Sequence, residues 1–331
     1  LIGLKMHAQL VINEYSASNW KQFIDNHNDY EDWFEIYNGY PTDVDLVGYY
    51  LSDEDDNLTK WQFPSGSIIP ANGFLWCSGR NTVDGEYYHT NFRLTQTKNN
   101  PDQIIISNPG AVIVDSLTMD FTLTHHSRAR AMDGSATWKI CTLPTPGATN
   151  AGAEMYTDYT DRPDMSVLGG FYGGPVTVEL TSTTPDGNIH YTLDGGEPKI
   201  SDPVYAAPIT INATAVLKAR VFSSNPDLIP GKLQFNTYFI NVNHVLPVVS
   251  IAGDTLLELA NGNQELEPIG SIEVFGKDLD SKTRSYGELN SHAQDSWAND
   301  QRSIDWVSRD EFGYRSAPKY KFVSSSEHDE F

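Results

Sequence analysis

Trp33-Phe34-Glu35-Ile36-Tyr37 is the stretch that decides the fold class, because apolar and polar side chains alternate along it. Successive side chains of a β-strand point to opposite faces, so we expect Phe34 and Ile36 on one face and Glu35 on the other. Such a strand has one side against a core. Similar short runs recur along the chain, separated by turn residues, and they predict a mainly β protein.

A second pair of runs predicts a β-hairpin. Ile104-Ile105-Ile106 and Val112-Ile113-Val114 flank the turn sequence Asn108-Pro109-Gly110-Ala111. In such a turn proline fixes its own φ and glycine accepts a positive one. Helical periodicity is weak elsewhere, and the best candidates for helices are the short segments 20–26 and 255–260.

The size and composition of the chain exclude several classes of protein. Its 331 residues exceed one ordinary domain, and its 14 Phe, 17 Tyr and 7 Trp are too many for a disordered chain. The net charge of -22 disfavours binding to a phosphate backbone, so nucleic acid is not an expected partner. No apolar run reaches the roughly 18 residues that a bilayer-spanning helix needs, so no membrane span is expected.

The two ends of the chain predict an exported fragment. Leu1–Leu4 is a short apolar run followed by Met6-His7-Ala8, as at the end of a secretory signal cleaved after Ala8. An ordinary exposed N-terminal strand is the alternative. The chain stops at Phe331 soon after a strand-like region, so we expect it to be part of a longer, secreted or cell-surface polypeptide.

Changes of pattern divide the chain into three blocks. Small and turn-forming residues at 144–152 end the first block. The second block begins near Gly169 and the third near Asn243, and both contain alternating runs typical of strands. These runs are Val176–Leu180, Ile189–Leu193 and Leu217–Val221 in the second block, and Pro247–Ile251, Ser271–Phe275 and Ser303–Val307 in the third.

Motifs in the first two blocks occur in an order known from other proteins. They are Val11-Ile12-Asn13-Glu14, Asp32 to Asn38, Val44 to Asp53 and Pro144-Thr145-Pro146-Gly147 in the first block, and Ile189 to Pro198 and Leu217-Lys218-Ala219-Arg220 in the second. On these motifs the first block resembles a bacterial lamin tail domain, and the second resembles the C-terminal accessory domain of chitobiase. Both resemblances imply Ig-like β-sandwiches.

Leu246–Ile251 and Ile272–Phe275 are similar to the first two strands of a CotH (spore coat protein H) kinase-like domain. The segment His292–Gly313 lies where that family has a His-Gly motif, a lysine and an Arg-x-Glu-Tyr-Gly motif, but Ala293 replaces the glycine and Arg302 the lysine. A strand-borne lysine pairs with nucleotide phosphates in kinases, so the resemblance makes Arg302 a candidate nucleotide contact. A surface arginine on a strand is the alternative.

The same resemblance places the catalytic and metal-binding aspartates beyond Phe331. No kinase His-Arg-Asp or Asp-Phe-Gly pattern and no Walker loop occurs in the sequence. We expect no catalytic residue and no cofactor in this chain, whereas ATP and Mg²⁺ or Mn²⁺ would serve a full-length parent. The predicted organisation is a signal remnant (1–9), a lamin-tail Ig-like domain (10–150), a linker (151–168), a chitobiase-type Ig-like domain (169–242) and an incomplete α+β CotH-type segment (243–331).

Other candidate sites are weaker. Asp53-Glu54-Asp55-Asp56-Asn57 offers oxygen ligands at alternate positions, but Leu58 and Pro64 stand where an EF-hand needs glycine and glutamate. A weaker calcium contact and a solvated loop both remain open for this segment. His125-His126 lacks an HExxH context, so no metal site is predicted, and Asp115-Ser116 lacks the GxSxG elbow of a serine hydrolase.

The cysteines and tryptophans leave alternatives open. Cys77 and Cys141 lie in one block of a protein expected in an oxidising compartment, so they could form one disulfide bond. Exposed aromatic rings could also stack on sugars. The candidates for such stacking are Trp20, Trp33, Trp61, Trp76 and Tyr49-Tyr50. The strand positions of Trp33, Trp61 and Trp76 favour a place in the core.

Two functions from different classes fit the sequence. The first is a non-catalytic part of an exported cell-surface protein, whose Ig-like modules serve adhesion or spacing and whose partner is an unknown protein or glycan. The second is the accessory front of a CotH-type secreted kinase that uses ATP and a divalent metal. We favour the first for this chain, because its sequence lacks the catalytic motifs.

Overall fold

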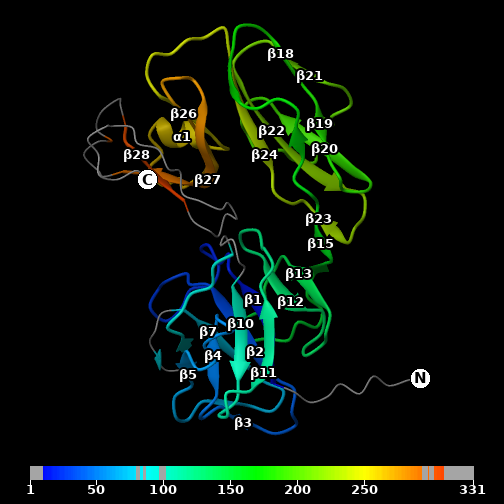
Figure 1. Ribbon diagram of the computed structural model, residues 1–331, viewed down its shortest axis with the longest axis vertical. Coiled ribbons are helices and arrows are strands. Elements are labelled where there is room, and N and C mark those ends of the chain that lie inside the picture. Colours follow the sequence, from blue (N-terminus) through cyan, green and yellow to red (C-terminus); the bar gives the residue numbers. More distant parts are fainter. Residues whose placement is uncertain are drawn as a thin grey trace. The chain divides into compact units, whose positions relative to one another are not determined.

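The computed structural model describes residues 10–79, 83–84, 87–96, 102–292, 297 and 302–308. The chain forms two compact units, Leu1–Asp158 and Tyr159–Phe331, and the second and third blocks of the sequence both lie in the second unit. Strands dominate both units, and α1 (Leu256–Ala260) is the one α-helix within the described residues (Figure 1). The predicted mainly β fold class is confirmed.

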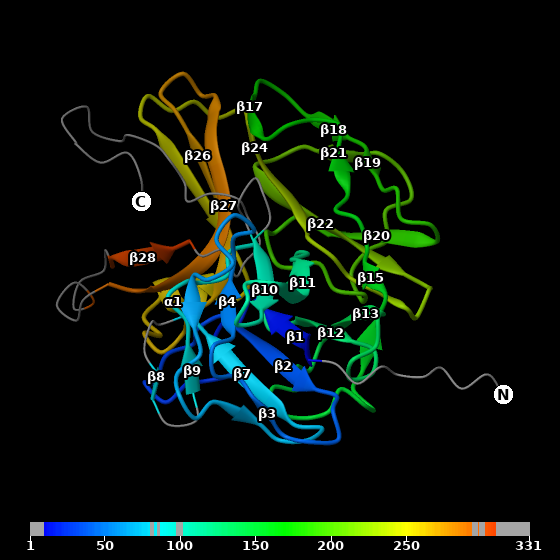
Figure 2. The ribbon, with the colours of Figure 1, turned by 60° about the horizontal axis from the view of Figure 1, so that its bottom comes forward.

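The first unit is a β-sandwich with two main sheets (Figures 1 and 2). The larger sheet has the order β14-β13-β12-β1-β2-β7-β9-β8, and the smaller has the order β11-β10-β4-β5. The strands of these sheets and of the short pair β3–β6 are β1 (Leu10–Ser16), β2 (Trp33–Asn38), β3 (Val44–Asp45), β4 (Tyr50–Ser52), β5 (Trp61–Gln62), β6 (Ile68–Ile69), β7 (Phe74–Ser78), β8 (Val83–Asp84), β9 (Tyr87–His89), β10 (Gln103–Ser107), β11 (Ile113–Thr118), β12 (Ser127–Arg130), β13 (Trp138–Cys141) and β14 (Met155–Tyr156).

The core of the first unit lies between its two sheets. Phe34 and Ile36 enter it from the larger sheet, and Leu51 and Ile106 enter it from the smaller. Glu35 turns to the opposite side of the larger sheet, which we call the outer face. The alternation predicted for this strand is therefore confirmed. Glu35 is nevertheless fully buried, because loops cover the outer face as well.

The predicted hairpin is confirmed, but its turn differs in one detail. β10 and β11 pair antiparallel, and the N–H of Ala111 donates to the carbonyl of Asn108 at 2.9 Å. The residue with positive φ is Ala111, at 55°, and Gly110 has none. A turn with proline at its second position is often followed by one residue in the left-handed region, and this arrangement places the positive φ after the glycine.

The expected helix at 20–26 is wrong, whereas the helix expected at 255–260 is confirmed as α1. Lys21 has a φ of 58°, which a helix does not allow. The side chain of Asn19 bonds to both the N–H and the carbonyl of Phe23. An asparagine side chain that takes backbone groups in this way offers the chain an alternative to a helix.

The second unit contains two four-stranded sheets and several short pairs. One sheet has the order β17-β24-β22-β20, and the other has the order β25-β26-β27-β28. The strands of this unit, with β15 beginning at its border, are β15 (Asp158–Tyr159), β16 (Asp164–Met165), β17 (Gly170–Tyr172), β18 (Val176–Val178), β19 (Leu180–Thr181), β20 (Gly187–Thr192), β21 (Ile209–Ile211), β22 (Ala215–Ser223), β23 (Leu228–Ile229), β24 (Gln234–Ile240), β25 (Val248–Ala252), β26 (Ile269–Phe275), β27 (Ser281–Ser291) and β28 (Ile304–Val307).

The strands predicted in this unit match the observed ones with one exception. The run 176–180 is divided between β18, which pairs with β21, and β19, which pairs with β16. Two sheets therefore share a stretch that the alternation alone presents as one strand. The core of the second block is formed by such residues as Val178, Leu217 and Tyr238.

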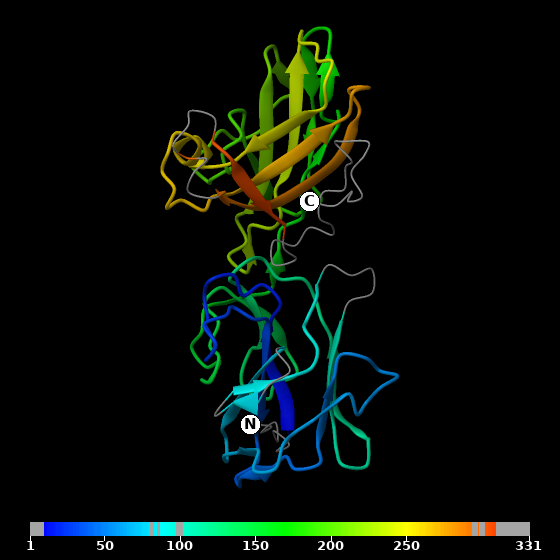
Figure 3. The same cartoon turned by 90° about the vertical axis from the view of Figure 1, so that its left-hand side faces the viewer.

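The third block packs against the second within this unit. Phe275 of β26 meets Phe171 and Phe239 edge-on, with ring centres 5.7 and 5.4 Å apart. Thr237 Oγ1 donates to Glu273 Oε2 at 2.6 Å. Figures 2 and 3 show the orange strands β26 and β27 beside the yellow-green strands β22 and β24. The two blocks therefore share buried contacts and form one compact unit.

Candidate binding site

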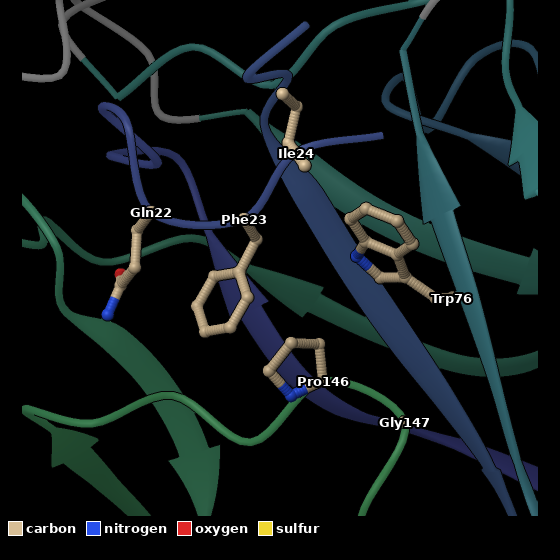
Figure 4. Close-up of a pocket in the computed structure, with 6 residues that line it drawn as sticks. All are labelled: Gln22, Phe23, Ile24, Trp76, Pro146 and Gly147. Carbon is tan, nitrogen blue, oxygen red and sulfur yellow. The ribbon is translucent and has the colours of Figure 1, made fainter. Parts of the chain in front are cut away.

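The first unit has a pocket of about 420 Å³ on the outer face of its larger sheet. Its lining consists of Gln22, Phe23 and Ile24 from the loop after β1, Trp76 from β7, and Pro146 with Gly147 from the loop after β13 (Figure 4). Figure 4 shows the rings of Phe23, Trp76 and Pro146 around one space, with Gln22 at one end. Mainly apolar lining with few polar groups is the usual form of a ligand site.

Aromatic rings form the floor of the pocket. Trp76 lies between Leu75 and Cys77, which both enter the core, so its side chain turns to the outer face. Its ring meets that of Trp33 at 6.4 Å and an interplanar angle of 67°, and Trp33 meets Phe23 at 5.9 Å and 82°. These edge-to-face contacts are favourable and fix the rings relative to the sheet.

The first wall of the pocket is the loop between β1 and β2. The buried Asn19 side chain accepts a hydrogen bond from the N–H of Phe23 at 2.9 Å. It donates to the carbonyls of Phe23 and Glu31, both at 2.8 Å. Asp25 accepts from two backbone N–H groups further along the loop. The wall is therefore held by groups of its own, without a ligand.

The second wall is the loop after β13, and two buried carboxyl groups hold it. The N–H of Gly147 donates to Glu35 Oε2 at 2.5 Å, and Thr145 Oγ1 donates to Glu14 Oε2 at 2.8 Å. The amide of Asn150 donates to a backbone carbonyl of the sheet at 2.9 Å. The proline that lines the pocket lies between these anchors, so this wall is also formed in advance.

Burial controls the charge of these two carboxyl groups. It raises the pKa of Glu35 from its ordinary 4.5 to about 9, although hydrogen bonds from Asn13 and Gly147 oppose the shift. Burial also raises the pKa of Glu14, against hydrogen bonds from Ser127 and Thr145. Glu35 is therefore protonated and uncharged at neutral pH, and the second wall contains no ionised group at this anchor.

A buried polar chain ties the first wall to the sheet. Ser78 Oγ and His89 Nδ1 are 2.5 Å apart, and His89 Nε2 is 3.0 Å from Asn26 Oδ1. A nucleophile, a base and an orienting amide are joined in this order in some hydrolases. Ser78 is only 3% exposed and His89 is fully buried, so a substrate does not reach them here. These hydrogen-bonded side chains therefore connect the loop with β7 and β9.

The structure separates the tryptophans that the sequence grouped as candidates for stacking on sugars. Trp33 and Trp61 are buried, as expected. Trp76 differs, because it is only partly buried and lines the pocket. Trp20 stacks on His125, with ring centres 5.5 Å apart and planes at 15°. A place in the core is thus wrong for Trp76 alone among the three strand tryptophans.

The candidate nucleotide contact, Arg302, is engaged with its own unit. Its Nη1 donates to the carbonyl of Ala260 at 3.0 Å, at the end of α1, and its guanidinium lies 5.8 Å from the ring centre of Trp297. No group of three or more His, Cys, Asp or Glu within the described residues could hold a metal. Some expectations concern residues outside those that the structure describes. They are the signal remnant at 1–9 and the motifs of the CotH resemblance at Ala293 and 309–313.

The disulfide bond that the sequence allowed is not formed. Cys77 on β7 and Cys141 on β13 are free, buried thiols. Three strands, β12, β1 and β2, lie between β7 and β13. Four strand spacings of about 4.8 Å therefore separate the two cysteines, far more than the roughly 6 Å between Cα atoms that a disulfide spans.

The remaining candidates have local partners. Lys60 Nζ lies 2.6 Å from Asp53 Oδ1 and 2.7 Å from Glu54 Oε1, so a lysine already pairs with two of the acidic residues that offered calcium ligands. Asp115 Oδ2 pairs with Arg130 Nη2 at 3.0 Å and also accepts from a backbone N–H of β1. Asp115, on β11 of the smaller sheet, therefore links that sheet to β1 and β12 of the larger sheet.

The sequence did not identify the residues of the pocket as a group. Gln22, Phe23 and Ile24 fell in the expected helix, and Pro146 with Gly147 fell in the expected domain boundary. One signal was present, because a glutamate in the middle of an apolar strand needs polar partners if its face is covered. Glu35 has these partners, and one of them is the pocket residue Gly147.

Two comparisons with known families agree with the first two resemblances. Residues 5–120 match the Lamin Tail Domain family, and residues 167–227 match the Chitobiase/beta-hexosaminidase C-terminal domain family. The resemblances to a lamin tail domain and to the chitobiase C-terminal domain are confirmed, and a bacterial origin stays a prediction. The lamin tail match includes three pocket residues of the first wall and Trp76. Neither match extends into the third block, where the likeness to CotH stays a prediction.

No curated protein matches the chain significantly. The Ig-like lamin tail and chitobiase-type regions fit a non-catalytic binding module. Within the described residues no helix is long and apolar enough to cross a membrane.

Proposed function

We propose that this chain is the non-catalytic binding part of an exported cell-surface protein. The observation that carries the proposal is the pocket of about 420 Å³ on the lamin tail unit. Both of its walls are held by hydrogen bonds that the buried side chains of Asn19, Glu14 and Glu35 accept. A site formed in advance loses little conformational entropy when a ligand enters, and this favours affinity.

The chemistry of the lining supports binding rather than catalysis. The six lining residues are Gln22, Phe23, Ile24, Trp76, Pro146 and Gly147, and none of them has an ionisable side chain. General acid–base and nucleophilic catalysis both need such groups within reach of the substrate. Recognition in this pocket would rest on shape and apolar contact.

The second unit supports a role in spacing. Its chitobiase-type block and its third block share the buried Phe275 contacts and the bond between Thr237 and Glu273. A unit with a shared core behaves as a stiff body, since opening it exposes apolar surface to water. Such a body suits a spacer that carries a binding unit away from a surface.

Two measurements on the whole chain test this proposal. Fractionation of the producing cells should recover the protein outside the cytoplasm, and the purified, fluorescently labelled chain should bind intact cells saturably. Ile24→Ser should reduce this binding, because Ile24 is 48% exposed and lines the pocket. Ile68→Ser is the matched control, since Ile68 is 51% exposed in the same unit. Cytoplasmic recovery together with no cell binding would overturn the proposal.

A second candidate is the accessory front of a CotH-type kinase that uses ATP and a divalent metal. The observation that favours it is the antiparallel sheet β25-β26-β27-β28 with α1 between its first two strands, in the block that resembles the opening of such a domain. Arg302, the one candidate contact, donates through Nη1 to the carbonyl of Ala260, and this bond competes with a phosphate for part of its guanidinium. The described chain also offers no metal cluster.

Calorimetric titration separates the two candidates. ATP with Mg²⁺ would be titrated into this chain and into a form extended through the whole third domain. Binding by the extended form that Arg302→Ala abolishes would support the kinase. No binding by either form would leave the binding and spacing role.

A further inference from the structure

We propose that the pocket takes a large apolar side chain from an extended segment of a basic protein partner. This inference rests on the proposed binding function and names its ligand class. The rings of Phe23, Trp76 and Pro146 enclose the space into which that side chain would insert (Figure 4). A volume of about 420 Å³ leaves room for the side chain and for part of the backbone beside it.

The polar edge of the pocket favours a peptide over a sugar. Gln22 supplies the one side chain among the six lining residues that offers both donors and an acceptor. Its amide can therefore bond the N–H and the carbonyl of a peptide group. A sugar ring would bring several hydroxyl groups into a space lined mainly by carbon. Hydroxyl groups that lose water without finding partners cost free energy.

The charge near the pocket indicates that the partner is basic. The loop 17–32, which forms the first wall, contains four acidic residues and one lysine, a local balance of -3. They are Asp25, Asp29, Glu31, Asp32 and Lys21. The whole chain has a net charge of -22. Such a field attracts basic partners, speeds their association and repels acidic ones. Asp25 is buried, and Glu31 Oε1 lies 3.2 Å from Arg93 Nη2. Basic residues that flank the apolar anchor would therefore remain in solvent and face the partly exposed Asp29 and Asp32.

Titration of the full chain with short probes tests the inference. The probes are the acetylated and amidated peptides Lys-Ala-Leu-Ala-Lys, Lys-Ala-Ser-Ala-Lys and Glu-Ala-Leu-Ala-Glu, and a neutral tetrasaccharide of N-acetylglucosamine. The readout is the NMR signal of the Trp76 indole N–H, assigned by its loss in Trp76→Phe. The basic leucine peptide should bind at least about tenfold more tightly than the serine peptide, because burial of one leucine supplies that difference.

The variants locate the binding on the molecule. Ile24→Ser should weaken the binding of the basic leucine peptide about fivefold or more, and Ile68→Ser should leave its affinity unchanged. The acidic leucine peptide should bind more weakly than the basic one, and added salt should reduce the difference between their affinities. Equal binding of the leucine and serine peptides, or no effect of Ile24→Ser, would overturn the inference.

The remaining outcomes separate this inference from the proposed function. A shift of the Trp76 signal by the tetrasaccharide and not by the leucine peptide would overturn the ligand class, while the binding function would stand. No shift by any probe, together with cell binding that persists in Ile24→Ser, would show that the pocket is not the binding site. No shift and no cell binding would overturn both proposals.

Discussion

The backbone N–H of Gly147 donates a 2.5 Å hydrogen bond to Oε2 of Glu35, across a separation of 112 residues in the sequence. This contact fastens the second wall of the pocket to the middle of the larger sheet. The other oxygen of Glu35 accepts from the side chain of Asn13 at 3.2 Å. A buried carboxyl group on the outer face of β2 therefore positions part of the candidate binding site.

Glu35→Gln should change the free energy of unfolding by less than about 1 kcal/mol at neutral pH, because glutamine has the shape of the protonated acid and keeps an acceptor for Gly147. Glu35→Ala should lower it by about 2–4 kcal/mol, since it removes an acceptor of the Gly147 N–H and of the Asn13 amide and opens a cavity at a fully buried side chain. Urea unfolding of the full chain, followed by NMR signals of β2, measures both. An equal loss in the two variants would show that Glu35 is ionised in the folded state.

The stability of the first unit should fall as the pH rises from about 4.5 to about 9. Burial raises the pKa of Glu35 between these values, so the folded state keeps a proton that the unfolded chain releases. By linkage, this stabilisation is fully present below about pH 4.5 and is lost as the pH rises through about 9. Glu35→Gln should flatten the profile of urea midpoints against pH. An unchanged slope in the variant would assign the effect to another group, such as Glu14.

The second unit should show the opposite trend above neutral pH. Lys218 is fully buried, and its Nζ donates to the carbonyl of Ala252 at 3.0 Å. Burial lowers the pKa of Lys218 from 10.5 to about 8, although Glu197 and Asp254 oppose the shift. The folded state then releases a proton that the unfolded chain keeps, so stability rises between about pH 8 and 10.5.

Lys218→Met is the variant that tests this trend. Methionine fills a similar volume without a charge, and Ser271 still donates to Ala252, so the variant should fold. Urea midpoints followed by NMR signals of β22 should rise with pH in the parent chain and stay flat in the variant. Parallel profiles in the two proteins would show that Lys218 is not the titrating group.

Much of the fold followed from the sequence because one face of each main strand meets a core. Phe34 and Ile36 alternate with Glu35 as a half-buried strand requires, and the structure places them accordingly. Prediction failed at 20–26, because the Asn19 side chain binds the backbone of Phe23 there in place of a helix. A single side chain can override a weak local preference in this way.

The candidate site could not be predicted from local patterns. Its residues come from three distant segments, which meet because β2 pairs with both β1 and β7 and because Gly147 reaches Glu35. The sequence indicated that Trp76 lies on a strand, but alternation does not say which face a loop covers. That information lies in contacts such as the edge-to-face pair of Trp76 and Trp33.

The two cysteines should behave as protected thiols. Burial raises the pKa of Cys77, and it raises the pKa of Cys141 to about 11, so neither forms the reactive thiolate at neutral pH. The native chain should react slowly with a thiol reagent such as DTNB, and the chain in urea should react rapidly at two sites. The intact mass should be unchanged after reduction. A gain of about 2 Da on reduction, one hydrogen per released thiol, would show a disulfide and contradict the strand order.

Phe275→Ala should destabilise the second unit by about 3–5 kcal/mol, because it removes a fully buried ring from the cluster with Phe171 and Phe239. Leu257→Ala is the control, since Leu257 is 76% exposed and its truncation should cost less than about 0.5 kcal/mol. In the parent chain, NMR signals of β22 and of β26 should be lost with the same urea midpoint. In Phe275→Ala they should again be lost together, at a lower urea concentration. If β26 melts while β22 keeps the parent's midpoint, the third block folds apart from the chitobiase-type block, and the shared core does not bind them into one cooperative unit.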